Sequence, residues 1–395
     1  MTRKKTVVLG VTGGIAVYKS LDIVSRLKKK GIDVFVIMTK SAQEFVTELS
    51  FRSLSLNPVT TDMFETPSSF DVEHISLAQR ADVFLVAPAT ANIIGKVANG
   101  IADDMLSTTI MATTAPVVFV PAMNTNMYLN KINQRNISIL KEYGYNFIDP
   151  ISGRLACGDV GIGKMESPEV IVEYVESLLT EKDYSGKNLL ITAGPTSENI
   201  DPVRHITNKS SGKMGYALAR AARNRGANVT LITGKTSIEK PNFINIVEVF
   251  SAKEMHDKVM DNLESADIVI KAAAVSDYRL ERESTQKIKK SSNELTLNLI
   301  KNKDILKSIS NKKGNRIIVG FAAETENLIE NAKKKIQSKN LDMIIANDVS
   351  RNDSGFNVDT NKVTIITRDS IEELDTKSKD EVSNDILDRI LKIKR

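Results

Sequence analysis

The single cysteine of the chain, Cys157, lies in a glycine-rich stretch that covers residues 156–165. An unpaired cysteine is usually a small core residue, but three glycines within seven residues are better suited to a flap than to a core strand. A thiol in a mobile, polar loop favours chemistry over packing. We therefore interpret Cys157 as a catalytic residue.

The segment Thr12-Gly13-Gly14-Ile15-Ala16 joins a predicted strand directly to a predicted helix. Backbone N–H groups at a helix N-terminus, with glycines that allow close approach, can bind a phosphate. The signal is weak by itself, because a tight strand-to-helix turn uses the same residues and the spacing is not Gly-x-Gly-x-x-Gly. Two more loops, 87–92 and 121–128, follow predicted strands at the same sheet edge, where ligands of open α/β sheets bind.

Short runs rich in valine and isoleucine alternate with longer amphipathic stretches, which is typical of a mainly parallel sheet with crossover helices. The pattern predicts strands at 7–11, 34–38, 83–87, 117–121, 189–192, 229–233, 268–272, 317–320, 343–346 and 363–367. It predicts helices at 15–30, 168–179 and 213–225, with Gly31 and Gly226 as stops. A polar, aperiodic segment at 180–187 separates the two runs. We expect an α/β protein with two doubly wound, Rossmann-like domains in series, residues 1–182 and 186–395.

The composition limits the function classes. One cysteine allows no intrachain disulfide, and the histidines His74, His205 and His256 lie too far apart in sequence for a zinc cluster. The net charge of +5 comes from lysines spread among acidic residues, so phosphorylated small molecules fit better than nucleic acid. The first apolar run is too short for a signal peptide, and no window approaches the roughly 18 apolar residues of a membrane helix. We therefore expect a cytoplasmic protein.

The motifs of the first half, taken in order, point to one known family. They are Gly13-Gly14-Ile15-Ala16, His74, Ala87-Pro88-Ala89-Thr90-Ala91-Asn92, Pro121-Ala122-Met123-Asn124 and Ala156-Cys157-Gly158. Over most of residues 5–180 the chain resembles the flavin-dependent phosphopantothenoylcysteine decarboxylases. The resemblance implies a flavodoxin-like flavoprotein domain that uses FMN.

The second half has its own set of motifs. They are Thr192-Ala193-Gly194-Pro195-Thr196, Asp201-Pro202-Val203-Arg204, Asn208-Lys209-Ser210-Ser211-Gly212-Lys213-Met214-Gly215, Ala272-Ala273-Ala274-Val275-Ser276-Asp277-Tyr278, Lys287-Ile288-Lys289-Lys290, Val319-Gly320-Phe321-Ala322-Ala323-Glu324-Thr325 and Ala346-Asn347-Asp348. This half resembles phosphopantothenate-cysteine ligase, and the whole chain resembles the bifunctional bacterial enzymes of coenzyme A biosynthesis. The resemblance implies a nucleotide-binding ligase domain.

The resemblance implies two consecutive reactions. The ligase half would activate the carboxylate of 4'-phosphopantothenate with CTP and Mg2+ as an acyl-cytidylate, from which cysteine's amine would displace CMP. The decarboxylase half would use FMN to oxidise the thiol end of the product to a thioaldehyde, which accepts the electrons when carbon dioxide leaves. Reduced FMN would return the hydride while Cys157 supplies a proton, so no nicotinamide cofactor is required.

Three side chains of the first half would act on the substrate. Asn124 would hydrogen-bond the carboxylate and amide of the substrate, although an asparagine after a strand is also a common turn residue. His74 would act as a base or hydrogen-bond donor near the flavin, or it is a surface histidine, and sequence spacing does not separate the two. Cys157 would close over the substrate on its flap.

The resemblance assigns further residues of the first half to binding. The substrate would also contact Met123. The residues assigned to FMN are Gly13, Gly14, Ile15, Ala16, Thr39, Ala89, Thr90, Asn92, Ser107 and Thr108.

In the second half, Ser210, Ser211 and Gly212 would bind phosphate through backbone amides at the start of a helix, although a serine-rich N-cap is common without a ligand. Asn208 matches the position that assists the second half-reaction, and Lys287 the one that stabilises charge at the nucleotide's α-phosphate. Lys289 or Lys290 can replace Lys287 in this role. The other substrate-binding positions are Ala273, Asp277, Lys303, Asp304, Ile305, Leu306, Phe321, Lys335 and Lys339, of which the last two lie one helical turn apart.

Two positions depart from the family pattern. Lys271 stands in a strand where the family usually has a small or apolar residue, and Gln286 stands where an acidic residue often precedes Lys287. Either residue can alter the nucleotide pocket, so the preference for CTP over ATP is a weaker expectation than the ligation itself. No metal ligand is assigned.

Family resemblance also suggests homo-oligomers, with trimers of the flavin domain, FMN near subunit contacts, and dimers of the ligase domain. Two alternatives remain open. A flavin-binding regulatory subunit would need neither Cys157 nor an intact ligase half, and a peptidyl-cysteine decarboxylase would share only the motifs of the first half.

Overall fold

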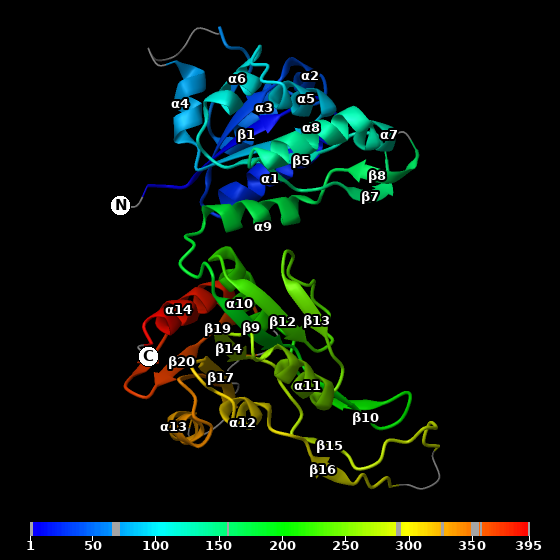
Figure 1. Cartoon of the computed structure of the whole chain (residues 1–395), viewed down its shortest axis with the longest axis vertical. Helices are drawn as coiled ribbons and strands as arrows, with labels where there is room; N and C mark the ends of the chain where they lie inside the picture. Colours follow the sequence, from blue (N-terminus) through cyan, green and yellow to red (C-terminus); the bar gives the residue numbers. More distant parts are fainter. Residues whose placement is uncertain are drawn as a thin grey trace. The chain divides into compact units, whose positions relative to one another are not determined.

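The structure, a computed structural model, describes residues 3–64, 72–155, 158–289, 294–324, 328–348, 355 and 358–393. The chain forms two compact units, Met1–Thr180 and Glu181–Arg395. Each unit is an α/β fold around its own sheet (Figure 1). The predicted fold class of two doubly wound, mainly parallel domains is confirmed.

The sheet of the first unit has six parallel strands in the order β3-β2-β1-β4-β5-β6. The strands are β1 (Thr6–Val11), β2 (Asp33–Met38), β3 (Val59–Thr60), β4 (Val83–Ala89), β5 (Val117–Pro121) and β6 (Asn146–Phe147). This is the order of Rossmann folds, with its reversal between β1 and β4. Every residue of β1 and β4 is buried, because helices cover both faces of the sheet.

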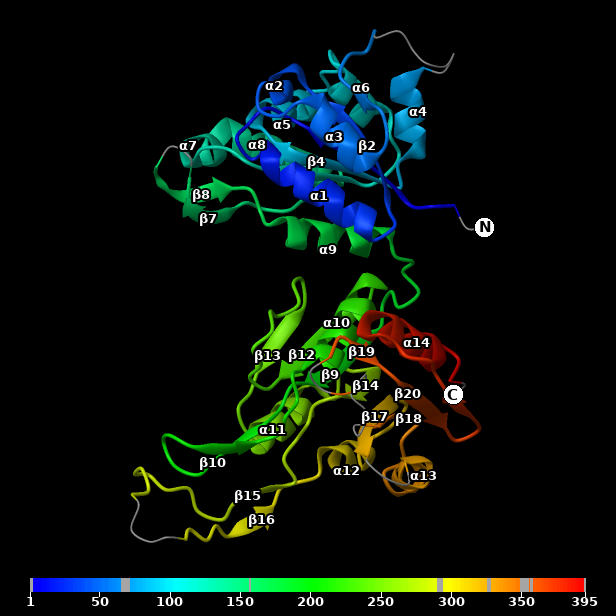
Figure 2. The same ribbon diagram turned by 180° about the vertical axis from the view of Figure 1, so that it is seen from behind.

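Helices pack on both faces of this sheet. The helices are α1 (Val17–Lys29), α2 (Lys40–Gln43), α3 (Glu48–Ser55), α4 (Glu73–Arg80), α5 (Ala91–Ala98), α6 (Met105–Ala112), α7 (Thr125–Leu129), α8 (Lys131–Glu142) and α9 (Pro168–Leu179). On one face α1, α3 and α9 form one apolar cluster, and α1 and α9 lie side by side (Figures 1 and 2). On the other face α4, α5, α6 and α8 form a second cluster.

A separate antiparallel hairpin precedes α9. It consists of β7 (Ile151–Arg154) and β8 (Val160–Lys164), and β8 lies within the glycine-rich stretch predicted to form a flap. Cys157 and Ala156 lie outside the described residues. Leu155 and Asp159, on either side of them, are joined by a backbone hydrogen bond of 2.8 Å.

The sheet of the second unit has eight strands in the order β13-β12-β9-β14-β17-β18-β20-β21. They are β9 (Asn188–Ala193), β12 (Asn228–Thr233), β13 (Asn245–Glu248), β14 (Ile268–Lys271), β17 (Ile317–Glu324), β18 (Met343–Asp348), β20 (Val363–Thr367) and β21 (Ile371–Glu373). Parallel pairing joins six strands of this sheet: β9, β12, β13, β14, β17 and β18. At one edge β20 pairs antiparallel with β18, and β21 pairs antiparallel with β20. The order reverses between β9 and β14.

Two groups of helices enclose this sheet. They are α10 (Lys213–Asn224) and α14 (Lys379–Leu391) on one face, and α11 (Ala252–Asn262), α12 (Ile305–Ser310) and α13 (Leu328–Ser338) on the other. Figure 2 shows α10 and α14 side by side, in agreement with their contacts. Short strand pairs lie outside the sheet: β10 (Ser197–Asn199) with β11 (His205–Thr207), β15 (Tyr278–Leu280) with β16 (Leu299–Lys301), and β19 (Thr360–Asn361) with β22 (Lys377–Ser378).

Glycines end the helices where the sequence predicts it. Gly31 after α1 and Gly226 after α10 have φ angles of 77° and 90°, which favour glycine.

The polar segment predicted to separate the two domains also contributes side chains to the second unit. Tyr184 is fully buried in the core of the second unit, where its hydroxyl donates to the carbonyl of Leu387 at 2.6 Å, and Asp183 pairs with the mostly buried Arg225.

Candidate active sites

A cavity of about 740 Å³ lies at the carboxyl ends of β1, β2 and β4. It is thus at the switch point of the first sheet, where ligands of open α/β folds bind. Four residues that the sequence assigns to FMN line it: Gly13, Thr39, Thr90 and Asn92. The strand-to-helix loops that carry them come from separate parts of the chain and meet here because parallel strands end at the same edge.

Thr12 connects two of these loops. Its buried hydroxyl donates to the carbonyl of Pro88 at 2.7 Å and accepts from the backbone N–H of Thr90 at 3.1 Å. Gly13 follows directly, and a Cβ placed on it would lie 2.4 Å from the Cβ of Ser41, which is closer than atoms can approach. A Cβ on Gly14 would meet nothing within 4 Å. The first of the two glycines is therefore required by packing, whereas the second is not.

The start of α6 forms another wall of the cavity. Asp104 caps this helix by accepting from the backbone N–H of Ser107 at 2.8 Å, and it also receives the ammonium of Lys96 at 2.7 Å. Burial alone would raise the pKa of Asp104, but the hydrogen bonds from Lys96 and Ser107 outweigh it, so the pKa is lowered. The hydroxyl of Ser107, assigned to FMN, is engaged in this cap.

Other residues assigned to this site lie around the cavity rather than in its lining. Ile15 is 62% exposed on the turn after Gly13, and Ala89 is fully buried in β4. Thr108 lies on α6 with its hydroxyl oxygen buried, and that oxygen has no hydrogen-bond partner among the described residues. His74 lies on α4 and is partly buried, and it does not appear among the described residues that line the cavity.

The loop after β5 places Asn124 next to the hairpin. Asn124 caps α7, its side-chain oxygen accepting from the backbone N–H of Asn126 at 2.8 Å. The N–H of Met123 donates to the carbonyl of Gly163 in β8 at 3.0 Å. Gly163 has a φ of 136°, and a Cβ on it would lie 2.2 Å from the carbonyl oxygen of Met123. Glycine at this position therefore lets the hairpin that carries Cys157 dock against the Asn124 loop.

A second cavity, of about 510 Å³, lies in the second unit, at the carboxyl ends of its central strands. It brings together most of the residues assigned to the ligase substrates from five separate segments. Those that line it are Asn208, Ser210, Ser211, Gly212, Ala273, Asp277, Leu306, Phe321, Lys335 and Lys339. Lys287, Lys303, Asp304 and Ile305 are not among the described residues that line it, although Asp304 pairs with Lys339 at 2.8 Å.

The helix α10 begins at the wall of this cavity. Gly212 precedes it with a φ of 81°, and a Cβ there would lie 2.7 Å from the side chain of Thr236 and 3.4 Å from the Cα of Gly194. The glycine thus allows the helix N-terminus to approach β9 closely. Asn208 donates from its side chain to the carbonyl of Ala274 at 2.9 Å, which links the loop before α10 to the loop after β14.

Cationic side chains surround one end of this cavity. Lys335 reaches it from α13, Lys339 from the turn directly after α13, and Lys271 from the end of β14. Burial would raise the pKa of Asp304, the N-cap of α12, but the hydrogen bond from Lys339 outweighs it and lowers the pKa. Lys271, which departs from the family pattern and which we expect from the sequence to affect the nucleotide pocket, also lines this cavity.

Lys287 lies outside this cavity on an exposed segment, and the structure shows how that segment is held. The backbone N–H of Ile288 donates to the carboxylate of Asp201 at 3.1 Å, and the carbonyl of Ile288 accepts from the Arg204 side chain at 3.0 Å. The Asp201 side chain is fully buried and also receives the Arg204 guanidinium. The Arg204 hydrogen bond holds the pKa of Asp201 far below its usual range, with backbone N–H groups acting in the same direction.

Several residues of the lining were not assigned from the sequence, among them Asn347, Asn361 and Lys379. Asn347 and Asn361 have buried side-chain oxygens without a hydrogen-bond partner among the described residues. Lys379, at the start of α14, is mostly buried and donates to the carbonyls of Gly355, at 2.9 Å, and Val358. Burial lowers the pKa of Lys379 to about 8, and Lys213 adds to this effect. Asn347 stands in the quoted Ala346-Asn347-Asp348 motif, whereas Asn361 and Lys379 follow no motif.

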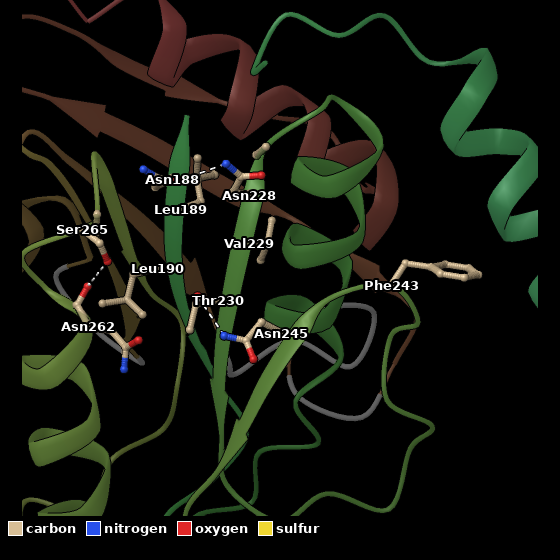
Figure 3. A pocket seen from close by; sticks show the side chains of 12 residues that line it. Asn188, Leu189, Leu190, Asn228, Val229, Thr230, Phe243, Asn245, Asn262 and Ser265 are labelled. Carbon is tan, nitrogen blue, oxygen red and sulfur yellow. Dashed lines mark hydrogen bonds between the residues drawn. The ribbon is translucent and has the colours of Figure 1, made fainter. Parts of the chain in front are cut away.

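A third cavity, of about 340 Å³, lies at the opposite ends of the strands in the second unit (Figure 3). Asparagines at the starts of β9, β12 and β13 line it. They bond within the wall: Asn228 donates to Asn188 at 3.1 Å, and Asn245 to the Thr230 hydroxyl at 3.4 Å. Figure 3 shows the Phe243 ring turned away from them. No residue assigned to a site lines this cavity among the described part of the chain.

Metal-binding clusters and membrane-spanning helices are both missing from the described residues. In that part of the chain, no group of three or more histidine, cysteine, aspartate or glutamate side chains could hold a metal ion. Every helix described there is too short or too polar to cross a membrane.

The fold and the first cavity define a two-domain α/β protein whose first unit is of the flavoprotein class. Residues 1–180 match the family model described as "Flavoprotein", and residues 184–393 match "DNA/pantothenate metabolism flavoprotein C-terminal domain". The structure of the C-terminal domain of a coenzyme A biosynthesis bifunctional protein CoaBC is 41% identical, covering 53% of this chain and 96% of that chain with a TM-score of 0.47.

Relatives match over the whole length. The coenzyme A biosynthesis bifunctional protein CoaBC of Bacillus subtilis is 49% identical over 99% of this chain and 97% of the relative. The protein of the same name from Escherichia coli K12 is 43% identical over 98% of this chain and 97% of the relative. The chain therefore belongs to the family of bifunctional CoaBC proteins of coenzyme A biosynthesis.

Proposed function

We propose that this protein catalyses two consecutive steps of coenzyme A biosynthesis. Its second unit joins 4'-phosphopantothenate to cysteine at the expense of CTP, and its first unit decarboxylates the resulting 4'-phosphopantothenoylcysteine to 4'-phosphopantetheine with FMN. The observation that carries the proposal is that both units of a bifunctional family are present in one chain, each with a cavity at its own switch point. We assign the decarboxylase to residues 1–182 and the ligase to residues 186–395.

The first cavity fits a flavin nucleotide. Gly13 lines the cavity at the start of the strand-to-helix turn, and a Cβ on Gly14, the next residue, would meet nothing within 4 Å, so a phosphate can approach the backbone of this turn. Bound FMN supplies a reversible two-electron acceptor for the thiol-bearing carbon of the substrate. The amide of Asn124 holds the substrate carboxylate, and Cys157, outside the described residues, supplies the final proton. His74 is assigned to proton transfer or hydrogen bonding near the flavin.

The second cavity fits a phosphorylated, anionic substrate. Backbone amides at Ser210–Gly212 and the lysines of α13 offer donors for phosphate groups. The carboxylate of 4'-phosphopantothenate attacks the α-phosphate of CTP and pyrophosphate leaves, with Lys287 stabilising the developing charge. The amine of cysteine then attacks the acyl carbon and CMP leaves, assisted by Asn208. Mg2+ enters with the nucleotide phosphates, as is usual for this ion.

The same proposal covers assembly and location. We assign the protein to the cytoplasm, and expect trimers through the flavin unit and dimers through the ligase unit. Exposed Ile15 and Tyr18, 62% and 59% accessible beside the Gly13 turn, support subunit contacts near the flavin. Light scattering of the purified protein measures the oligomer size, and a monomer would contradict this part.

The test is product analysis by mass spectrometry. FMN-loaded protein receives 4'-phosphopantothenate, cysteine, Mg2+ and either CTP or ATP. We expect 4'-phosphopantetheine, CMP and pyrophosphate with CTP, and less product with ATP. If no coupled product forms with either nucleotide, the ligase assignment falls and a peptide ending in cysteine is tried as the substrate of the first unit.

Two variants separate the half-reactions. Cys157→Ser should still ligate and should accumulate 4'-phosphopantothenoylcysteine or a dehydrogenated form of it. Asn208→Ala should fail to ligate but should decarboxylate 4'-phosphopantothenoylcysteine that is supplied to it. If both variants lose both activities, the two units do not act as separate sites, and the assignment of one reaction to each unit is wrong.

A further inference from the structure

Lys271 is the last residue of β14, at the switch point of the second sheet. It pairs with Thr192 of β9 on one side and with Gly320 of β17 on the other. Side chains alternate along a strand, and Val269 lies in the apolar layer under α11, α12 and α13. The Lys271 side chain therefore points to this same side.

The surroundings of Lys271 are charged but give it no direct partner. Among the described residues, its ammonium has neither a hydrogen bond nor an ion pair, although the residue is partly buried and lines the cavity. The charged groups that face it are Asp304 at the start of α12, Lys335 on α13, Lys339 directly after that helix, and Asp277 in the loop after β14. Asp304 is already paired with Lys339 at 2.8 Å.

Neither of these carboxylates pairs closely with Lys271. Asp304 is held by Lys339, and no ion pair joins Asp277 to Lys271 among the described residues. A partly buried cation without a partner costs free energy. A protein can keep such a cation at a site where a ligand supplies the missing negative charge. Because Lys271 lines the cavity, an anionic group that enters it can contact the ammonium.

We propose that Lys271 binds a phosphate group of a substrate in the second cavity, either of the nucleotide or of 4'-phosphopantothenate. Neither the relatives nor the motifs assign a role to this side chain. The inference rests on the proposed function for the identity of its two ligands.

Proton uptake follows from the position of Lys271. Burial lowers its pKa to about 8, with Lys339 and Lys335 adding to this and Asp304 and Asp277 opposing it. A phosphate beside the ammonium raises the pKa again. At pH 8 about half of the Lys271 side chains are neutral without ligand, so binding takes up roughly half a proton. The affinity for the ligand should therefore fall as the pH rises above 8.

The experiment measures binding of CTP, CMP, cytidine and 4'-phosphopantothenate to the full-length protein by titration calorimetry at pH 8, in buffers of different ionisation enthalpy. Lys271→Met keeps the length of the side chain and removes the charge. We expect about 10- to 100-fold weaker binding of one phosphorylated ligand, and no proton uptake. A loss for CTP that exceeds the loss for CMP assigns Lys271 to the nucleotide, and a loss for 4'-phosphopantothenate alone assigns it to that substrate.

Two further variants act as controls. Lys271→Arg keeps the charge and does not titrate near pH 8, so it should restore binding of the ligand without proton uptake. Lys334→Met removes an exposed lysine charge from the same helix as Lys335 and should change neither the ligand affinity nor the proton uptake. The apoprotein of Lys271→Met should unfold at the same or a higher temperature than the parent, because an unpaired buried charge has been removed.

Unchanged affinities for both phosphorylated ligands in Lys271→Met would overturn the proposal. An equal loss for cytidine and CTP would also overturn it, because the contact would not be with a phosphate. A parent protein without ligase activity would instead contradict the proposed function. These failures are distinguishable, because the first two appear in the variant and the last in the parent.

Discussion

At the scale of single residues, Asp201 shows how a buried carboxylate can set the position of the segment that carries Lys287. Its oxygens accept the N–H groups of Val203, Arg204 and Ile288, and they hold the Arg204 side chain. Arg204 in turn donates to the carbonyl of Ile288. The segment that carries Lys287 is thereby attached to the loop that leads to Asn208.

We expect Asp201→Asn to lower the ligation rate by about 10- to 100-fold, because a small displacement of a reacting group has this order of effect. The amide keeps the shape of the carboxylate but replaces one acceptor by a donor. Decarboxylation of supplied 4'-phosphopantothenoylcysteine should be unchanged. The two rates are measured separately, and an equal loss in both would show a general folding defect instead.

The same substitution has a defined pH dependence. The folded-state pKa of Asp201 is lowered, so its stabilising effect is present above the unfolded pKa of about 3.9 and disappears as the pH falls through the folded value. The difference in free energy of unfolding between parent and Asp201→Asn should be largest near neutral pH and should shrink below about pH 4. Urea unfolding at pH 7, 5 and 3 measures it. A difference independent of pH would show that the charge is not the cause.

At the scale of elements, the turn between β1 and α1 separates two neighbouring glycines with different roles. Gly13→Ala would place a Cβ 2.4 Å from the Cβ of Ser41, whereas Gly14→Ala would meet nothing within 4 Å. Forcing a methyl group into packed structure costs about 1–3 kcal/mol, so flavin binding to Gly13→Ala should weaken about 5- to 150-fold.

The matched control in this turn is Gly14→Ala, which should bind flavin about as well as the parent. Titration of the apoprotein with FMN, followed by flavin fluorescence, compares the three proteins. If both variants bind FMN equally weakly, close contact between the ligand and the Gly14 backbone determines the affinity, and the packing of Gly13 against Ser41 does not.

The hairpin β7–β8 offers a second paired test. Gly163→Ala would push a Cβ to 2.2 Å from the carbonyl oxygen of Met123, while a Cβ on Gly158, also at positive φ, would meet nothing within 4 Å. Both substitutions strain the backbone by about 1–2 kcal/mol, but only the first displaces the hairpin from the Asn124 loop.

We therefore expect Gly163→Ala to reduce decarboxylation at least about tenfold, with a smaller effect from Gly158→Ala. Ligation should be unchanged in both. Steady-state rates on supplied 4'-phosphopantothenoylcysteine give the comparison. An equal effect of the two substitutions would assign it to loop strain near Cys157 rather than to docking of the hairpin.

At the scale of the whole molecule, the two units have separate cores, so each should fold alone. A fragment of residues 181–395 should ligate, and one of residues 1–180 should decarboxylate when given FMN. A fragment of residues 187–395 lacks Tyr184 and Asp183 and is the matched comparison. It should be less stable than 181–395 by about 3–5 kcal/mol, because a fully buried aromatic side chain is removed.

Chemical unfolding of the two ligase fragments, followed by circular dichroism, measures this difference. Equal stabilities would show that residues 181–186 only connect the units. Loss of ligation in residues 181–395, with its fold intact, would instead show that the ligase depends on the flavin unit.

Much of the architecture was predictable, because the signals are local. Alternation of apolar runs with amphipathic stretches requires strands covered by helices, and Gly31 and Gly226 end helices by backbone freedom alone. The antiparallel strands β20 and β21 at the sheet edge were not predicted as such, because a short apolar run does not encode the direction in which it pairs. The polarity of residues 180–187 likewise concealed Tyr184 as a core residue.

The sequence by itself determined the family, the order of the two units and the loops that meet at each cavity. Parallel strands bring their following loops to one edge, so Gly13, Thr90 and Ser210–Gly212 could be placed from the order of the strands alone. Only the tertiary structure decided the environment of Lys271 and the hydrogen bond from the Ile288 N–H to Asp201. The same holds for the Asn361 side-chain oxygen, which has no hydrogen-bond partner among the described residues. Charge balance, burial and hydrogen bonding at these positions depend on groups that lie far apart along the chain, and no local pattern specifies such distances.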